Sequence, residues 1–214
     1  MHTLSATFAM GCFWSPEALF GSTRGVIRTR VGYAGGQLPG PTYKRLGDHT
    51  ETVQLDYDPE QLSFKQLLQL FWSGHNPAKP VWGRQYMSAI FYQDQVQQQQ
   101  AKESLEQQSL GGILRFPTEL WSLERFYPAE PYHQKHYLRR HTDLMKELAG
   151  RFADEAALIS STVAARLNGA LAGFGEIVDL ASELNGLGIS EKDAKRLVAL
   201  VQEPQSIPLR SRTL

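Results

Sequence analysis

The sequence contains one cysteine, Cys12, and its neighbours favour a reactive thiol over a buried structural one. Ser15 is of a type that caps helix N-termini, Pro16 suits the first helical position and Glu17 suits the positive end of a helix. These residues predict a helix that begins just after Cys12. Unpaired amide donors and the helix dipole at that point favour a thiolate, which lowers the pKa of the thiol and makes the sulfur nucleophilic.

A glycine and two aromatic residues complete this motif. Gly11 permits a sharp backbone turn, and Phe13 with Trp14 supplies aromatic faces beside the sulfur. The pattern predicts a small apolar pocket that contains a nucleophile. A lone cysteine is more often a small buried hydrophobic residue, so the helix start and the flanking aromatics are the features that favour chemistry here.

A carboxylate that could act as an acid lies in a predicted strand over 49–57. Val53, Leu55 and Tyr57 alternate along one face, and Glu51 has the same parity. Burial on an apolar face disfavours the charged form, so it would raise the carboxyl pKa and let the group hold a proton near neutral pH. A strand-end glutamate that bends to solvent or pairs with an arginine explains this pattern equally well.

Composition and charge describe a protein with an ordinary hydrophobic core and no general affinity for polyanions. The 214 residues are 42% hydrophobic and 21% charged, and 22 basic residues balance 22 acidic ones. This balance gives no indication of binding to nucleic acid or to anionic lipid. One cysteine can form neither an internal disulfide nor a thiolate zinc cluster, so no metal site is expected. Without a recognisable export signal or membrane span, the sequence predicts a cytoplasmic protein.

Alternating and helical patterns predict a strand, a helix, two strands, a helix and a strand, followed by one more helix and strand. The expected strands cover 4–10, 26–34, 49–57, 86–92 and 118–124, and the expected helices cover 16–21, 64–71 and 93–110. The first six elements predict the α+β class. The expected architecture is a split βαβ (ferredoxin-like) two-layer sandwich, with helices packed on one face of a single sheet.

The composition changes after Gly150, which predicts a boundary between residues 1–150 and residues 151–214. Tyr132 to Leu148 is typical of one helix. Beyond the boundary, residues 151–203 contain no tryptophan, tyrosine, cysteine or histidine and predict three short helices, broken at Asn168-Gly169 and at 185–188. We expect a helical extension without chemistry of its own, and a flexible tail over 204–214.

Taken together, the motifs resemble those of the A-type peptide methionine sulfoxide reductases. The matching stretches follow in order from Gly11 to Gln134: Gly11-Cys12-Phe13-Trp14 with Glu17, Gly32-Tyr33-Ala34-Gly35-Gly36, Pro41-Thr42-Tyr43, His49-Thr50-Glu51, Tyr57-Asp58-Pro59, Gln85-Tyr86, Tyr127-Pro128-Ala129-Glu130 and Tyr132-His133-Gln134. The cysteine motif alone is moderately specific, whereas all stretches in this order are strongly so. The resemblance makes residues 1–150 a reductase-like catalytic domain and leaves residues 151–214 uncovered.

The resemblance implies thiol-dependent reduction of methionine sulfoxide, in its S epimer, either free or in peptides and proteins. In the family a cysteine attacks the sulfoxide sulfur, a glutamate protonates the oxygen, two tyrosine hydroxyls hold that oxygen and an aromatic pair encloses the methyl group. The matching residues here are Cys12 and Glu51 for catalysis, with Tyr43, Tyr86, Phe13 and Trp14 for substrate binding. The products are methionine and a sulfenic acid on the cysteine, a reaction that serves protein repair under oxidative stress.

Two departures from the family pattern bear on this chemistry. Many members have later cysteines that attack the sulfenic acid, but this sequence has none. No bound cofactor is expected, and an external thiol such as thioredoxin, glutaredoxin or glutathione would reset Cys12. The loop before Tyr86 is also shorter than usual: Val81 falls where the family has an aspartate, Trp82 enters the loop, and Met87 replaces a common arginine. Loss of the acidic group bears on oxygen binding, substrate preference and rate.

Two other functions fit part of the pattern. A degenerate relative would be a redox-sensing or binding protein, in which oxidation of Cys12 is the signal and the helical extension engages a partner. A cysteine hydrolase would need a histidine base near Cys12, but no hydrolase signature surrounds the cysteine. The candidate bases are His49, His75, His133, His136 and His141. The joint presence of Cys12, Glu51, Tyr43 and Tyr86 favours the reductase.

Overall fold

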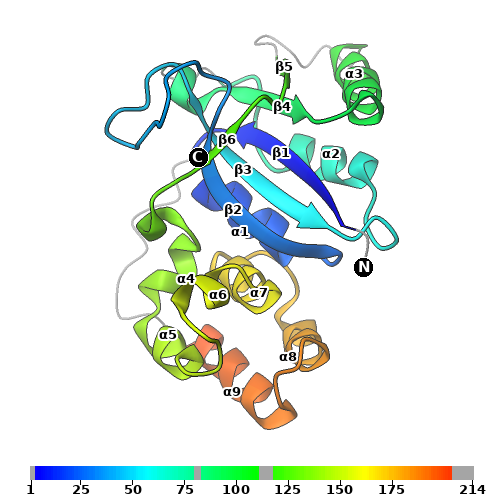
Figure 1. Ribbon diagram of the computed structural model, residues 1–214. Coiled ribbons are helices and arrows are strands. Elements are labelled where there is room, and N and C mark those ends of the chain that lie inside the picture. Colours follow the sequence, from blue (N-terminus) through cyan, green and yellow to red (C-terminus); the bar gives the residue numbers. More distant parts are fainter. Residues whose placement is uncertain (1–2, 80–82, 111–117, 204–214) are drawn as a thin grey trace.

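A single mixed sheet organises residues 4–128 in the computed structural model, which describes residues 3–79, 83–110 and 118–203. Within these ranges six strands follow the order β5-β4-β1-β3-β2-β6 (Figure 1). Their bounds are β1 Leu4–Met10, β2 Val26–Ala34, β3 Thr50–Tyr57, β4 Ser88–Tyr92, β5 Glu119–Ser122 and β6 Phe126–Pro128. The pairs β4–β1, β1–β3, β3–β2 and β2–β6 are antiparallel, and β5 pairs with β4 in parallel.

Helices cover the sheet and form a separate group beside it. Their bounds are α1 Trp14–Ser22, α2 Phe64–Ser73, α3 Gln95–Leu110, α4 His136–Arg140, α5 Thr142–Leu148, α6 Glu155–Ile159, α7 Thr162–Leu171, α8 Ile177–Gly186 and α9 Glu191–Gln202, with 3-10 turns η1 Arg84–Tyr86 and η2 Pro131–His133. In Figure 1, α1 and α2 lie against the sheet, whereas α4 to α9 gather beyond β2. The predicted α+β class is confirmed. Among the described residues, no helix is long and apolar enough to cross a membrane.

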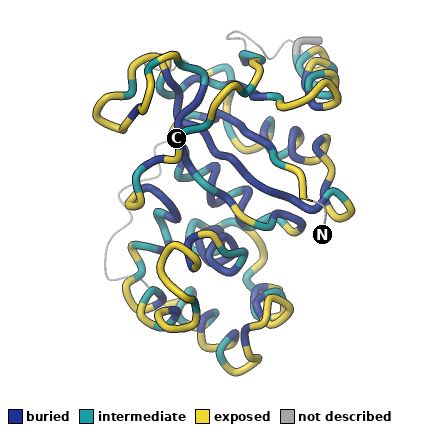
Figure 2. The backbone as a smooth tube through the Cα atoms, viewed as in Figure 1, coloured by how far each residue is buried: buried dark blue, intermediate teal, exposed yellow. Residues whose placement is uncertain are grey.

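The alternation expected in β1 and β3 builds the first hydrophobic core. Phe8 stacks on Phe20 of α1 and on Phe64 of α2, with ring centroids 5.3 and 5.9 Å apart. Leu55 pairs with Ala6 across the β1–β3 ladder and belongs to the same buried cluster. The central strands are accordingly buried along most of their length (Figure 2). Because side chains alternate along a strand, Glu51 faces the same side as Leu55, at the end of β3 nearest the start of α1.

A second hydrophobic core joins α4 and α5 to the later helices. Leucines from all parts of this group belong to one buried cluster: Leu138, Leu144, Leu148, Leu158, Leu167, Leu180, Leu184 and Leu197. The predicted division at residue 150 stays a prediction. The packing nevertheless places the last leucines before that position in the same core as the helices after it.

The helix α7 docks tightly on α1 and β2. A Cβ atom on Gly169 would lie 2.6 Å from the Ser22 side chain and 2.7 Å from the carbonyl oxygen of Ala18, so only glycine permits this close approach. Arg166 donates to the backbone carbonyl of Gly21 and, at 2.9 Å, to that of Val26. The C-terminal helices are therefore bonded directly to the helix that follows Cys12.

The predicted break at Asn168-Gly169 is wrong. In the described part of the C-terminal region there are four helices instead of three, and α7 runs through both residues. Gly169 serves the close helix contact, and Asn168 Oδ1 accepts the backbone N–H groups of Tyr137 and Leu138 at 3.0 and 3.2 Å. Packing and a long-range cap thus outweigh the turn preference of this pair.

Three other local predictions are corrected. The helix α1 begins at Trp14, with Phe13 at the N-cap position, so Ser15 lies inside the first turn and caps nothing. Strand β4 begins at Ser88, and the preceding residues form the turn η1. The single helix expected over 132–148 is divided at Lys135, whose φ of 52° is left-handed, and again at His141. The predictions for Val81, Trp82 and the tail over 204–214 lie outside the described residues.

Candidate active site

Cys12 lies at the turn that joins β1 to α1. Gly11 has a φ of 82°, a left-handed conformation that favours glycine and redirects the chain out of the sheet. Cys12 is an exposed residue at this turn. The backbone N–H of Trp14 donates to the thiol, as expected at the start of a helix.

Glu51 lies beneath this turn with both carboxyl oxygens engaged. Glu51 is only 1% exposed. Oε2 accepts the backbone N–H of Phe13 at 3.1 Å, and Oε1 accepts Nε2 of Gln85 at 2.7 Å. Burial raises the pKa of this carboxyl group, and the two hydrogen bonds oppose that rise. The parity of β3 thus places a carboxyl group with a raised pKa next to the cysteine turn, and neither donor to it carries a charge.

The predicted direction for the Cys12 pKa is wrong. Burial by surrounding protein raises the pKa of the thiol to about 11; the Trp14 N–H lowers it, and the negative charge of Glu51 raises it further. The helix start therefore acts as expected, but it is outweighed by desolvation. The thiol of this exposed residue is therefore protonated at neutral pH.

Tyr43 and Tyr86 converge from two different segments. Their side chains hydrogen-bond to each other, and the pKa of Tyr86 is raised by burial, by this bond and by the nearby charge of Glu51. Tyr43 is 39% exposed, and its backbone N–H donates to Oε1 of Glu130 at 2.9 Å. The two phenols accordingly form a hydrogen-bonding pair beside the carboxyl group and the thiol.

An aromatic cluster flanks the cysteine. Phe13 is buried, with its ring 5.1 Å from His133, and Trp14 stacks on His136 at 3.7 Å with an interplanar angle of 7°. Tyr132 covers His133 at 4.1 Å. Both ring nitrogens of His133 and Nε1 of Trp14 are buried without a hydrogen-bond partner in the described structure. The structure brings together all six residues named from the sequence and adds three residues to which the resemblance gave no role: Tyr132, His133 and His136.

Comparisons with known proteins match this arrangement. The family model for peptide methionine sulfoxide reductase matches residues 4–162. The chain belongs to the peptide methionine sulfoxide reductase family. It is therefore an oxidoreductase that acts on methionine sulfoxide, and the degenerate alternative is not favoured.

Relatives extend the match over different lengths. A peptide methionine sulfoxide reductase of Drosophila melanogaster is 48% identical over 192 residues, which cover 87% of this chain and 75% of the fly protein. MsrA of Methanococcus maripaludis is 39% identical over 153 residues, 67% of this chain and 98% of the archaeal protein. Methionine sulfoxide reductase A of Corynebacterium diphtheriae superposes with a TM-score of 0.57 at 33% identity, covering 64% of this chain and 74% of the other.

A buried ion pair anchors the cysteine helix of this reductase. Glu17 and Lys135 are both 0% exposed, with Lys135 Nζ 2.6 Å from Oε1 of Glu17 and 2.7 Å from the carbonyl oxygen of Thr29. The Lys135 backbone N–H donates to Oε2 of the same carboxylate at 2.8 Å. The pair thus ties α1 to the segment that carries His133 and His136. Its signal in the sequence is the matching glutamate that follows the cysteine motif.

The histidine contacts do not support a hydrolase. His49 bonds to Leu38 and Gly36, His75 to Phe71 and Ser88, and His141 to Leu200 and Leu144. His133 and His136 pack on aromatic rings. Each of these five histidines therefore has a structural environment of its own. Within the described ranges, no group of three or more histidine, cysteine, aspartate and glutamate side chains could hold a metal ion.

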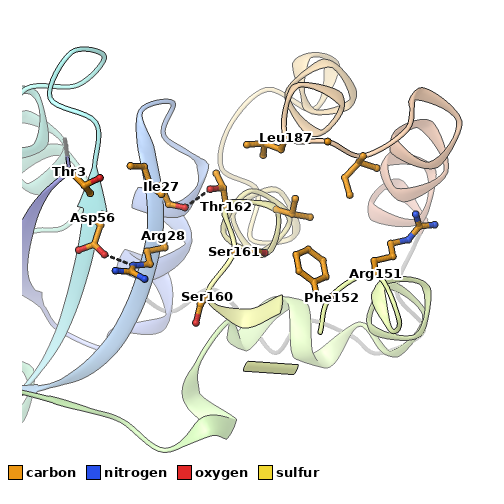
Figure 3. Close-up of a pocket in the computed structure, with 13 residues that line it drawn as sticks. Thr3, Ile27, Arg28, Asp56, Arg151, Phe152, Ser160, Ser161, Thr162 and Leu187 are labelled. Atoms are coloured by element: carbon orange, nitrogen blue, oxygen red, sulfur yellow. Dashed lines mark hydrogen bonds and ion pairs between the residues drawn. The ribbon is translucent and has the colours of Figure 1, made fainter. Parts of the chain in front are cut away.

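A cavity of about 620 Å³ lies away from Cys12, between β2 and the C-terminal helices (Figure 3). None of the six predicted site residues lines it. Its charged groups already have partners, since Arg28 pairs with Asp56, and Arg151 pairs with Glu147 and Asp193. Thr162 donates to the backbone of Ile27 at 2.6 Å. The cavity lies between the two cores, and the six predicted site residues lie at the exposed turn instead.

Proposed function

We propose that Cys12 is the nucleophile and Glu51 the proton donor in the reduction of methionine sulfoxide, in its S epimer. The observation that carries this assignment is the Glu51 carboxyl group, buried beneath the cysteine turn and bonded only to neutral donors. Oxygen leaves a sulfoxide well only when it is protonated. A carboxyl group with a raised pKa next to the thiol of an exposed cysteine supplies that proton.

The first half-reaction transfers the sulfoxide oxygen to the enzyme. The Cys12 sulfur bonds to the sulfoxide sulfur while Glu51 gives its proton to the oxygen, and the proton that the thiol loses restores the Glu51 carboxyl group. Collapse of this intermediate leaves the hydroxyl group on Cys12 and releases methionine, so the thiol and the sulfoxide become a sulfenic acid and a thioether. The Cys12 sulfur is oxidised by two electrons and the substrate sulfur is reduced by two. Protonation of Glu51 also removes the charge that opposes thiolate formation.

The remaining site residues bind the substrate. Tyr43 and Tyr86 present their hydroxyl groups to the oxygen, which supports its negative charge before the proton arrives. Phe13 and Trp14 enclose the methyl group on the opposite side of the sulfur. A sulfoxide has three different substituents around sulfur, so separate sites for oxygen and methyl select one epimer.

The second half-reaction needs an external thiol, because the sequence has no other cysteine. One thiol attacks the sulfenic acid and releases water, and a second reduces the resulting mixed disulfide and restores Cys12. The chemistry suits a thioredoxin-type protein, glutaredoxin or glutathione, acting in the cytoplasm. The exposure of Cys12 supports direct attack by any of the three.

Two finer assignments of the fold accompany this proposal. The central order β4-β1-β3-β2, with antiparallel neighbours and with α1 and α2 between the strands in sequence, supports a split βαβ unit as the frame of the site. We assign catalysis to residues 1–150 and support of α1 to residues 151–214. Contacts of Arg166 and Gly169 with α1 favour that supporting role.

Separate epimers of methionine sulfoxide, with dithiothreitol as reductant, test the proposal. We expect turnover of the S epimer by the wild type and none by Cys12→Ser. After one turnover without reductant, mass spectrometry should find Cys12 as a sulfenic acid, or as a mixed disulfide when glutathione is present. A free thiol after stoichiometric methionine release would contradict the cycle.

A further inference from the structure

We propose that Gln85 is a positioning residue that holds one oxygen of the Glu51 carboxyl group, and so controls the direction and the pH range in which Glu51 donates its proton. This inference rests on the proposed role of Glu51. It extends that role to a residue that does not itself touch the reacting atoms.

The contact is direct and geometrically specific. Gln85 Nε2 lies 2.7 Å from Oε1 of Glu51, and the Phe13 N–H occupies the other oxygen at 3.1 Å. Each oxygen has two lone pairs and each donor uses one. The acidic proton must therefore occupy a position that neither amide blocks, and the two amides together fix the plane of the carboxyl group.

The turn that carries Gln85 is itself anchored on both sides. The Gln85 carbonyl accepts Oγ1 of Thr50, the residue before Glu51, at 2.9 Å. Arg84 donates from Nε to the carbonyl of Asp48 at 2.7 Å and from Nη2 to that of Gly35 at 3.1 Å. The next residue is Tyr86, so one short turn fixes both an oxygen-binding phenol and the orientation of the acid.

Gln85 also acts on proton affinity. Titratable groups face Glu51 from three elements: Cys12 from the end of β1, Tyr33 from the paired position on β2, and Tyr86 from η1. Burial is the main cause that raises the pKa of each of these three groups, so all three are neutral at pH 7. The carboxylate of Glu130 lies behind Tyr33 and accepts a hydrogen bond from the Tyr33 hydroxyl group at 2.7 Å. A neutral amide donor stabilises the ionised carboxyl group and opposes the effect of burial. Gln85 thereby limits how far burial raises the pKa of Glu51.

The decisive experiment is the single-turnover rate of methionine formation as a function of pH, without reductant, for the wild type and Gln85→Leu. Loss of the amide raises the pKa of Glu51, so the acid form persists to higher pH and the descending limb moves up by about one pH unit. Loss of orientation lowers the maximal rate about tenfold. The control is Gln99→Leu, which removes an exposed glutamine that bonds to Glu103 on α3 and should leave the profile unchanged.

A second variant and a second measurement keep the test independent of folding defects. Gln85→Glu places a carboxyl group against Glu51, and since two such groups share a proton, its descending limb should also move upward. Carboxyl carbon NMR with labelled glutamate should show the Glu51 titration move upward in a Cys12→Ser background when Gln85 is replaced by leucine. A uniformly slower profile with an unmoved limb and an unmoved titration would overturn the inference. Absence of stoichiometric methionine from the wild type would instead overturn the proposed function.

Discussion

Glu17 and Glu51 are both buried glutamates beside the first turn of α1, but their partners differ in kind. Glu17 meets the ammonium group of Lys135, with both side chains 0% exposed. Glu51 meets only a backbone amide and the amide of Gln85. A cation at 2.6 Å fixes a charge in place, whereas neutral donors leave a carboxyl group free to exchange a proton. Two residues of one type thus divide into a structural anchor and a candidate acid through their partners.

The largest test of this division is Glu51→Gln, which keeps the shape and removes the proton donor. We expect sulfoxide reduction in a single turnover to slow by about 10²–10⁴-fold, the usual contribution of a positioned acid. Circular dichroism should show an intact fold. The same rate assay on Glu17→Gln, per folded molecule, provides the comparison and should show little change. A loss smaller than about tenfold in Glu51→Gln would mean that another group protonates the oxygen.

Replacing Lys135 by methionine should have the opposite effect, because it should lower stability and leave the rate of the folded protein unchanged. It leaves the Glu17 carboxylate buried without its cation, so the free energy of unfolding should fall by about 3–5 kcal/mol, measured as a shift in the urea midpoint. The rate per folded molecule should remain close to that of the wild type.

Two variants sharpen the Lys135 result. The double variant Glu17→Leu with Lys135→Met removes both charges and should recover most of the lost stability. The matched control is Lys195→Met, which breaks the exposed ion pair with Glu191 on α9. Its urea midpoint should equal that of the wild type within error. Equal midpoint shifts for Lys135→Met and Lys195→Met would refute the anchoring role of the buried pair.

The smallest expected effect is a pH dependence of stability. The pKa of Glu51 is raised above its ordinary value of 4.5, so the folded state binds this proton more tightly than the unfolded state. Its contribution to stability is present below pH 4.5 and is lost as pH rises through the folded pKa. Glu51→Gln should therefore gain stability relative to the wild type as pH rises above 4.5. Urea unfolding of both proteins at several pH values measures this difference. A constant difference across that range would show that Glu51 has an ordinary pKa.

Local pattern predicted the parts of the site that depend on one strand or one helix start. Period-two alternation put Glu51 on the core face of β3, and the glycine before Cys12 indicated the turn. Tyr43 and Tyr86 were named only through the family resemblance, because long-range bonds such as Tyr43 to Glu130 and Thr50 to Gln85 place their segments. Single-sequence patterns do not encode such pairings.

Two failures have the same physical origin. The sign of the Cys12 pKa shift was wrong because the helix terms are local, whereas desolvation and the Glu51 charge come from the folded surroundings. The break expected at Asn168-Gly169 was wrong because these residues contact α1 and the backbone at Tyr137 and Leu138. In both cases tertiary contact reversed a local preference.

The exposure of Cys12 has a kinetic consequence. In the proposed cycle one sulfur receives the sulfoxide and later the reducing thiol, so the two react in turn and never together. We therefore expect ping-pong kinetics, in which double-reciprocal plots at different reductant concentrations are parallel. The sulfoxide and the reducing thiol also exclude each other, so a large excess of reductant competes with the sulfoxide for the reduced enzyme. The speed of repair then follows the ratio of the two supplies as well as the amount of each.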